Sequence, residues 1–107
     1  MPPFFFRVVC GLVAANSGLT LEVLTASHRC AAPVAQARQL AMYVAHVGLG
    51  VSQLDVARAF MRDRSTVAHA CHRIEDLREN DTFDAQVSRL ENGARWILQG
   101  ATCGQEG

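Results

Sequence analysis

A chain of 107 residues with a formal net charge of zero has room for one small domain with one modest hydrophobic core. Half of its residues are hydrophobic and 19% are charged, a composition typical of a globular protein rather than of a disordered one. Its four cysteines include no C-x-x-C pair, so we expect neither a zinc site nor a disulfide framework.

The charged residues are unevenly distributed along the chain. Residues 29–73 hold six arginines and two acidic residues, and six minus two gives a net charge of +4. Residues 74–96 hold three arginines and six acidic residues, and three minus six gives −3. A positive middle followed by a negative end indicates a small domain with one anion-facing side. The alternative is that both stretches are ordinary solvated surfaces.

The first segment, MPPFFFRVVCGLVAA, is apolar enough to suggest export. No basic residue precedes its apolar run, Arg7 interrupts that run, and the uninterrupted stretch 8–15 has only eight residues. Such a stretch is too short to span a bilayer. We therefore expect a core helix over residues 4–16, ended by Asn16-Ser17-Gly18, in a cytoplasmic protein.

Two further helices are expected before residue 50. Thr20 is placed to cap a short helix that reaches about Ala26, with Glu22 in its first turn. After a connection over 27–32, Pro33 suits the first turn of a helix that runs to about Val47. The expected inward residues of this helix are Val34, Ala37, Leu40, Ala41, Val44 and Ala45. Gly48 ends it, and GLG at 48–50 forms the next loop.

Residues 52–74 have the pattern of a helix-turn-helix. Ser52, with Asp55 three residues on, opens a first helix, and Asp63 with Thr66 is placed to cap a second one in the same way. The turn between them is 61–63. The expected buried stripe of the second helix is Val67, Ala70, Cys71, Ile74 and Leu77, and its outer side carries Arg64, Ser65, Ala68, His69 and His72. A small, polar and cationic outer face is typical of a recognition helix.

The acidic stretch 79–81 separates this helix from a last one. Thr82 or Asp81 is expected to cap the last helix, whose apolar stripe is Phe83, Val87, Leu90, Ala94 and Ile97. The residues after Gln99 have no periodicity. We therefore expect one domain over 1–99 and a disordered tail over 100–107.

Three runs resemble one known family: ARQLAMYV at 37–44, SQLDVARAF at 52–60 and RDRSTVAHACHRIEDLRE at 62–79. They are similar to the C-terminal DNA-binding domain (domain IV) of the bacterial chromosomal replication initiator DnaA, and the resemblance covers residues 5–95. It implies a compact all-α domain of about six helices with a Trp-repressor-like helix-turn-helix. The sequence contains none of the AAA+ module that precedes this domain in DnaA, so we expect a stand-alone short homologue.

The resemblance also implies which residues contact DNA. Arg38 of the ARQ run would enter the minor groove, where a guanidinium favours a narrow A·T-rich segment. Asp63, Arg64 and Ser65 would read base edges in the major groove. The alternative for Arg38 is a solvent-facing helix charge. The alternative for Asp63, Ser65 and Thr66 is that they only cap their helix.

Three more positions match residues that touch phosphates or lie beside them, namely Arg62, Thr66 and His69. Other positions depart from the family pattern: Arg64 stands where the family has a base-reading His, and Met61 where it has a Gly. The loop 46–51 is neutral where the family carries Lys or Arg, so we expect fewer phosphate contacts than in the initiator.

Two functions from different classes follow. The first is a small protein that binds double-stranded DNA and regulates replication or transcription. The second is a regulator that acts by binding a protein, such as the replication initiator or its inactivation machinery, through the apolar loop 47–51, Met61 and an exposed Phe4–Phe6 end.

An enzymatic role is not expected. The chain has no Lys, which excludes a P-loop, and it has no G-x-S-x-G or H-E-x-x-H motif. His69 and His72 share the outer face of their helix, but no carboxylate or Cys completes a metal set there. We therefore expect no cofactor and no metal, a monomer, and no membrane partner.

Overall fold

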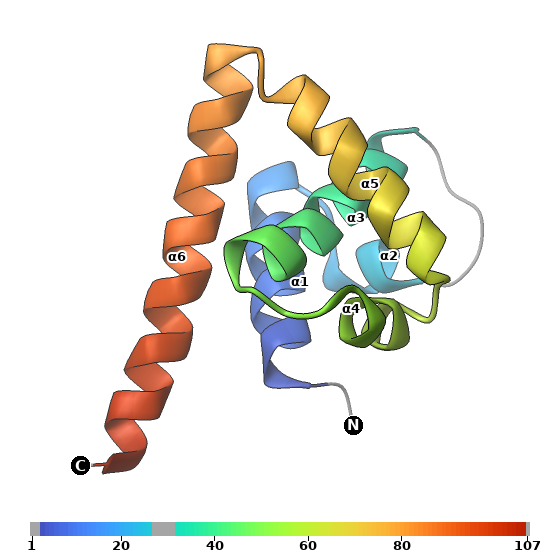
Figure 1. Ribbon diagram of the computed structural model, residues 1–107. Coiled ribbons are helices and arrows are strands. Elements are labelled where there is room, and N and C mark those ends of the chain that lie inside the picture. The colour runs from blue at the N-terminus through green and yellow to red at the C-terminus, as the bar shows by residue number, and fades with distance from the viewer. Residues whose placement is uncertain (1–2, 27–31, 107) are drawn as a thin grey trace.

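The structure, a computed structural model, describes residues 3–26 and 32–106. Its elements are α1 (Phe4–Ser17), α2 (Leu21–Thr25), α3 (Ala32–Tyr43), the π-helix η1 (Val44–Gly48), α4 (Gln53–Phe60), α5 (Arg64–Leu77) and α6 (Asp81–Glu106) (Figure 1). This confirms the predicted all-α architecture. Most of the predicted connection over 27–32 lies outside the described residues. Within the described ranges, no helix combines the length and the apolar character needed to cross a bilayer.

Local capping signals were predicted correctly for two helices. The hydroxyl of Thr20 accepts a hydrogen bond from the backbone N–H of Val23 at 3.1 Å, and α2 begins one residue after Thr20. The hydroxyl of Ser52 accepts from the N–H of Asp55 at 3.1 Å, and α4 begins at the next residue. Each cap satisfies an N–H group that the first turn of a helix leaves without a partner.

The prediction for the start of the last helix was wrong. The cap is Asn80, whose side-chain carbonyl accepts from the N–H of Phe83 at 2.9 Å, rather than Thr82 or Asp81. The side chains of Asn, Asp and Thr can all accept this bond, so their proximity in the sequence did not decide between them. At its other end α6 continues to Glu106, past the predicted end at Gln99. The division into a domain over 1–99 and a disordered tail over 100–107 stays a prediction.

Helix α3 is the centre of the molecule, because it packs against α1, α2 and α5 and continues directly into η1. Pro33 lies in its first turn, as predicted. The predicted inward residues Ala37, Leu40, Ala41, Val44 and Ala45 are buried, and Val34 is half-buried. Met42 and Tyr43 are buried as well, so the last turn of α3 is buried on all sides, whereas its first turns have an exposed side.

The switch from α3 to η1 places the loop before α4. The positive φ of Gly50, 76°, turns the chain so that the N–H of Val51 donates to the carbonyl of Ala45 at 3.1 Å. A Cβ atom at Gly48 would lie 3.0 Å from the Cγ atom of Glu91 on α6. A larger residue at position 48 would therefore require the Glu91 side chain to shift, whereas glycine allows η1 and α6 to approach this closely without such a shift.

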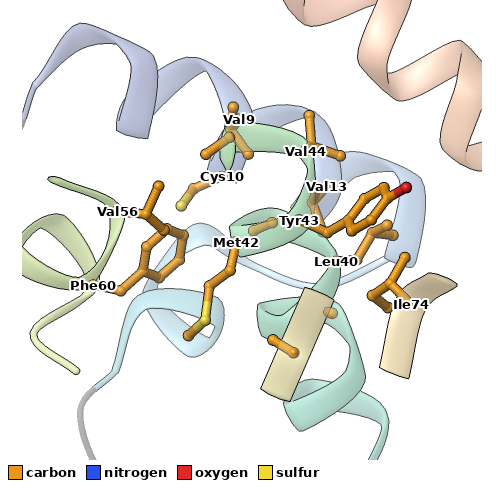
Figure 2. Packing of buried hydrophobic residues seen from close by; sticks show 14 of the residues in the cluster. Val9, Cys10, Val13, Leu40, Met42, Tyr43, Val44, Val56, Phe60 and Ile74 are labelled. Atoms are coloured by element: carbon orange, nitrogen blue, oxygen red, sulfur yellow. The ribbon is translucent and has the colours of Figure 1, made fainter. Parts of the chain in front are cut away.

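The hydrophobic core joins all six α-helices and η1, with Leu24 as the contribution of α2. Among its buried members are Val9, Cys10 and Val13 of α1, Leu40 and Tyr43 of α3, Val56 and Phe60 of α4, and Ile74 of α5 (Figure 2). Val87 and Ala94 of α6 belong to the same cluster. The rings of Phe6 and Phe60 meet edge-on with their centroids 4.8 Å apart. Phe5 and Phe6 both pack against the core, so of the predicted exposed Phe4–Phe6 end only Phe4 is exposed.

Two cysteine thiols belong to this core. Cys10 and Cys71 are both free and buried. Burial raises the pKa of Cys10 to about 12. The pKa of Cys71 is raised to about 11 by burial and, to a smaller extent, by the negative charge of Glu75. Both thiols therefore stay protonated at neutral pH.

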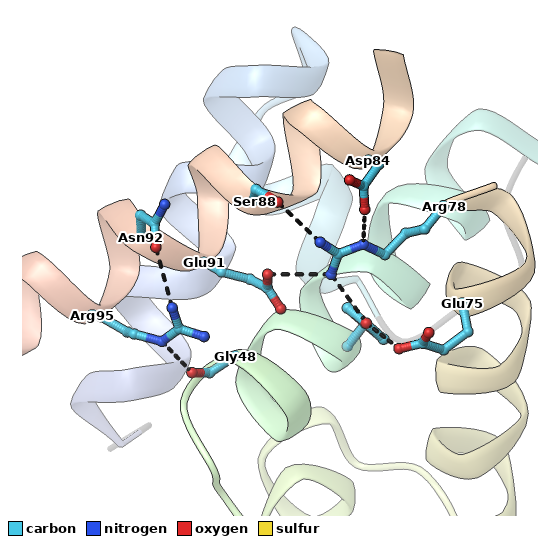
Figure 3. A network of polar contacts seen from close by, with 9 residues as sticks. Gly48, Glu75, Arg78, Asp84, Ser88, Glu91, Asn92 and Arg95 are labelled. Atoms are coloured by element: carbon cyan, nitrogen blue, oxygen red, sulfur yellow. Dashed lines mark hydrogen bonds and ion pairs between the residues drawn. The ribbon is translucent and has the colours of Figure 1, made fainter. Parts of the chain in front are cut away.

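Arg78, in the turn between α5 and α6, joins these helices to α3 (Figure 3). Its Nε atom donates to Asp84 Oδ1 at 2.5 Å and its Nη2 atom to Ser88 Oγ at 3.0 Å. Its Nη1 atom donates to Glu91 Oε1 at 3.2 Å and to the hydroxyl of Tyr43 at 3.1 Å. One guanidinium thus holds two residues near the start of α6, a buried carboxylate and the end of α3.

The same network continues to either side of Arg78. The Tyr43 hydroxyl donates to a carboxylate oxygen of Glu75, and burial, together with this hydrogen bond, raises the pKa of Tyr43 to about 12. On α6, Nε of Arg95 donates to the carbonyl of Gly48 at 2.7 Å. The first of these contacts joins α3 to α5, and the second joins α6 to η1.

The turn between α4 and α5 contains a strained residue. Met61 has φ 57° and ψ 48°, and it is the only residue other than glycine with positive φ among the described residues. Its side chain is 79% exposed, so little packing offsets the strain. A left-handed conformation costs a residue with a Cβ atom about 1–2 kcal/mol.

We expect Met61→Gly to raise the free energy of unfolding by about 0.5–1 kcal/mol, because relief of the strain exceeds the greater entropy of glycine in the unfolded chain. Urea denaturation followed by far-UV circular dichroism measures the change. Met61→Ala removes the same side chain but keeps the strain, so it serves as the control. Equal stability of the two variants would contradict the prediction.

Candidate nucleic-acid interface

Helices α4 and α5 form the predicted helix-turn-helix. The N–H of Arg62 donates to the carbonyl of Ala57 at 2.9 Å, which closes the end of α4 and makes the turn tight. Helix α5 packs on α4 and on α3. This arrangement leaves the N-terminal end of α5 at the surface (Figure 1).

The two sides of α5 agree with the predicted stripe. Val67, Ala70, Cys71 and Ile74 are buried and Leu77 is half-buried. On the outer face Arg64, Ser65, Thr66, His69 and His72 are exposed, and Ala68 is half-buried. The predicted base-reading and phosphate-contacting side chains of α5 therefore lie on one accessible face. Glu75 and Asp76 are exposed near the other end of the helix, where their carboxylates would repel an anion.

Asp63 occupies the N-cap position of α5, but its side chain makes no capping hydrogen bond. The predicted cap through this carboxylate was wrong. The backbone carbonyl of Asp63 accepts from the N–H groups of Thr66 and Val67 at 3.0 and 3.3 Å. Its side chain is exposed, so the missing cap leaves no buried polar group without a partner. Asp63 is thus free of the simple capping role that was the alternative to DNA contact.

The N–H groups of Arg64 and Ser65 donate to no group within the described part of the chain. They lie in the first turn of α5, where unpaired N–H groups and the helix dipole favour an anion. A phosphate or a base acceptor placed there would satisfy them.

Arg62 lies in the turn and is half-buried. Its Nη1 atom donates to the carbonyls of Met61 at 3.2 Å and of Phe60 at 3.5 Å. The guanidinium therefore lies back over the end of α4 and the turn. Its predicted contact with a phosphate stays a prediction.

Arg38 is 7% exposed, so its interpretation as a solvent-facing charge was wrong. Its Nε atom donates to the carbonyl of Leu24 at 2.7 Å, and its Nη2 atom donates to that of Val23 at 3.1 Å. These carbonyls belong to the last turn of α2, which has no intrahelical partners for them. In this structure Arg38 holds α2 against α3, and its predicted entry into the minor groove stays a prediction.

The spacing of α3 contained a signal for this burial. Positions 34, 38, 41 and 45 are four, three and four residues apart, which places them on one face of a helix. Ala41 and Ala45 are fully buried. The position of Arg38 within this stripe was therefore visible in the sequence, although its backbone partners were not.

The neutral loop before α4 has its own internal bonding. Nδ1 of His46 lies 2.7 Å from the carbonyl of Val51, and Leu49 and Val51 pack against the core. Val47 is 45% exposed. Within the described ranges, no group of three His, Cys, Asp or Glu side chains is placed to hold a metal ion.

Comparisons with known proteins point to the same region. The family described as "Bacterial dnaA protein helix-turn-helix" matches residues 7–74, which include most of α1 and all of the helix-turn-helix except the last three residues of α5. The chain is 38% identical over 71 residues to the chromosomal replication initiator protein DnaA of Pseudothermotoga lettingae. This match covers 64% of the chain and 16% of that protein.

A solved structure extends the similarity to the fold. The crystal structure of a DNA replication initiation factor superposes with a TM-score of 0.72 at 30% identity. The superposition covers 84% of this chain and 27% of the other one. The chain therefore spans a small part of the proteins it resembles, and that part contains the helix-turn-helix.

Proposed function

Because the chain belongs to the bacterial DnaA helix-turn-helix family, we propose that it is a small protein that binds double-stranded DNA and regulates replication or transcription. The observation that carries this proposal is the N-terminal end of α5. Asp63, Arg64, Ser65 and Thr66 are all exposed there, and the side chain of Asp63 is not engaged as a cap.

In the proposed complex, α5 enters the major groove with its N-terminal end foremost. Asp63, Arg64 and Ser65 face base edges. Three further residues, Arg62, Thr66 and His69, lie at or beside phosphates and hold the register without reading sequence. The protein acts as a monomer in the cytoplasm, where bacterial DNA lies, and binding involves no cofactor.

Arg38 has a different standing in this proposal. Its guanidinium would have to release the carbonyls of Leu24 and Val23 before it could enter a minor groove. Without such a rearrangement, Arg38 supports DNA binding indirectly. It fixes α2 beside α3, the helix on which α5 packs.

The test is fluorescence anisotropy with a duplex that carries the DNA site bound by the initiator DnaA, a scrambled duplex, and duplexes recovered by random-sequence selection. We expect Ser65→Glu to weaken binding at least tenfold, because its carboxylate would face the DNA phosphates. The fold should persist, since a negative charge in the first turn suits the helix dipole.

Ala85→Glu is the matched control, because Ala85 is exposed on α6 and the variant carries the same added charge away from α5. It should bind DNA about as tightly as the unmodified protein, apart from the small effect of net charge. Equal binding by the two variants, or a selection that returns no duplex bound by the unmodified protein, would contradict the proposed function.

The second candidate is a regulator that binds a protein such as the initiator or its inactivation machinery. The observation in its favour is a set of large apolar side chains at the surface, with Met61 79% and Trp96 77% exposed. A hollow of about 630 Å³ between α1 and α4 is bounded by Phe5, Val51 and Ala59. A DNA selection that returns nothing, combined with a biological effect that survives Ser65→Glu, would favour this candidate.

A further inference from the structure

Arg64 is the first residue of α5, and it is exposed. The Cα–Cβ bonds of a helix tilt toward its N-terminus, so the first side chain projects ahead of the helix. When a helix enters a groove with its N-terminal end foremost, this side chain reaches the floor of the groove before the side chains that follow it.

The Arg64 guanidinium is not committed to the protein. The ion pairs among the described residues are those that Arg78 makes with Asp84 and Glu91, so Arg64 makes no ion pair with the adjacent Asp63. Arg62, the other arginine of this region, donates to backbone carbonyls of the turn. Arg64 is therefore the cation at the front of α5 that can use all its donors on a ligand.

The neighbours of Arg64 on the same helix end leave room for such a ligand. Ser65 and Thr66 are short and exposed, and the first two N–H groups of α5 have no acceptor within the described ranges. A planar acceptor edge can therefore approach the guanidinium directly. The positive N-terminal end of the α5 dipole attracts the same acceptor.

The two parallel N–H donors of a guanidinium match a pair of neighbouring acceptors. In the major groove only guanine presents such a pair, N7 and O6. Adenine presents an acceptor beside a donor, thymine one acceptor and a methyl group, and cytosine a donor. The donor pattern of Arg64 therefore selects one base among the four.

We infer that Arg64 is a specificity-determining residue, which requires a guanine in the major groove at the position that faces the N-terminal end of α5. This inference rests on the proposed DNA binding and adds the class of duplex that is bound. The binding site would carry a G·C pair at that one position, and the other three pairs there would be rejected.

The experiment compares base preferences rather than affinity alone. A random-sequence selection with the unmodified protein gives its preferred duplex, and anisotropy is then measured on duplexes with each of the four bases at every position. We expect one position at which guanine is favoured about 5- to 150-fold, which corresponds to the discrimination of one bidentate contact.

Arg64→Gln should move this preference to adenine at the same position, because the Gln amide offers a donor and an acceptor that match adenine N7 and N6. Preferences at all other positions should stay unchanged. Arg89→Gln removes the same charge from an exposed site on α6 and should leave every preference as it was. Circular dichroism confirms that both variants are folded.

Two results would overturn the inference while leaving the proposed function intact. The first is a uniform loss of affinity in Arg64→Gln with unchanged preferences, which would make Arg64 a phosphate contact. The second is a preferred duplex in which no guanine position responds to the substitution. A selection that yields no preferred duplex would instead count against the proposed sequence-reading function itself.

Discussion

Replacing Arg78 with Met is expected to lower the free energy of unfolding by about 3–5 kcal/mol, the usual cost of breaking a buried ion pair from one side. The side chain of Glu91 is 9% exposed, and its described partner is Arg78. Its carboxylate would keep its burial and lose its counter-charge. The contact with Asp84 adds little to this loss, because the side chain of Asp84 is 47% exposed and well solvated.

Urea denaturation followed by far-UV circular dichroism tests this expectation. Arg73→Met is the matched control, because Arg73 is exposed on α5, five residues before Arg78, and its loss should change stability by less than about 0.5 kcal/mol. The double variant Arg78→Met with Glu91→Met should recover part of the loss, since it removes the uncompensated charge. A double variant no more stable than Arg78→Met alone would show that the ion pair is not the cause.

Replacing Arg38 with Met is expected to lower the free energy of unfolding by about 2–3 kcal/mol in the absence of DNA. Two carbonyls of α2 lose charged donors, and a buried acceptor left without a partner costs about 1–3 kcal/mol. Arg38→Lys should recover only part of the loss, because an ammonium cannot reproduce the two-pronged donor geometry of a guanidinium. Arg89→Met, at an exposed position, is the control.

The same variants separate the two roles of Arg38. Affinity for the selected duplex is measured by anisotropy at a temperature where every variant is fully folded. If Arg38 acts only by holding α2, the folded Lys variant binds DNA as tightly as the unmodified protein. A large loss of affinity in the folded variant would support the minor-groove contact, and full stability of Arg38→Met would contradict the structural role.

Interactions between near neighbours in the sequence were the predictable part of this fold. The caps at Thr20 and Ser52 join residues three apart, and the buried stripe of α5 follows the repeat of a single helix. Both features depend only on helical geometry. Helical geometry does not choose between adjacent capping candidates. This is why Thr82 or Asp81 was predicted as the cap of α6, although the cap is Asn80.

Contacts between helices were not predictable in this way. The partners of Arg38 are carbonyls 14 and 15 residues away, and the hydroxyl bound by Arg78 lies 35 residues away. Every residue has a backbone carbonyl, so residue types do not indicate which carbonyl a side chain will bind. The position of Tyr43 relative to Arg78 depends on how α5 crosses α3. The candidate DNA-binding face could be located because it lies on one helix, whereas the residues that orient this helix could not.

The buried thiols have a consequence for how this domain responds to oxidants and alkylating reagents. The thiolate is the reactive form of cysteine, and with pKa values of about 12 and 11 roughly one Cys10 in a hundred thousand and one Cys71 in ten thousand is ionised at pH 7. The two thiols belong to α1 and α5. Each thiol therefore reacts when the packing around it opens, so the two modification rates report on opening of the core around α1 and around α5.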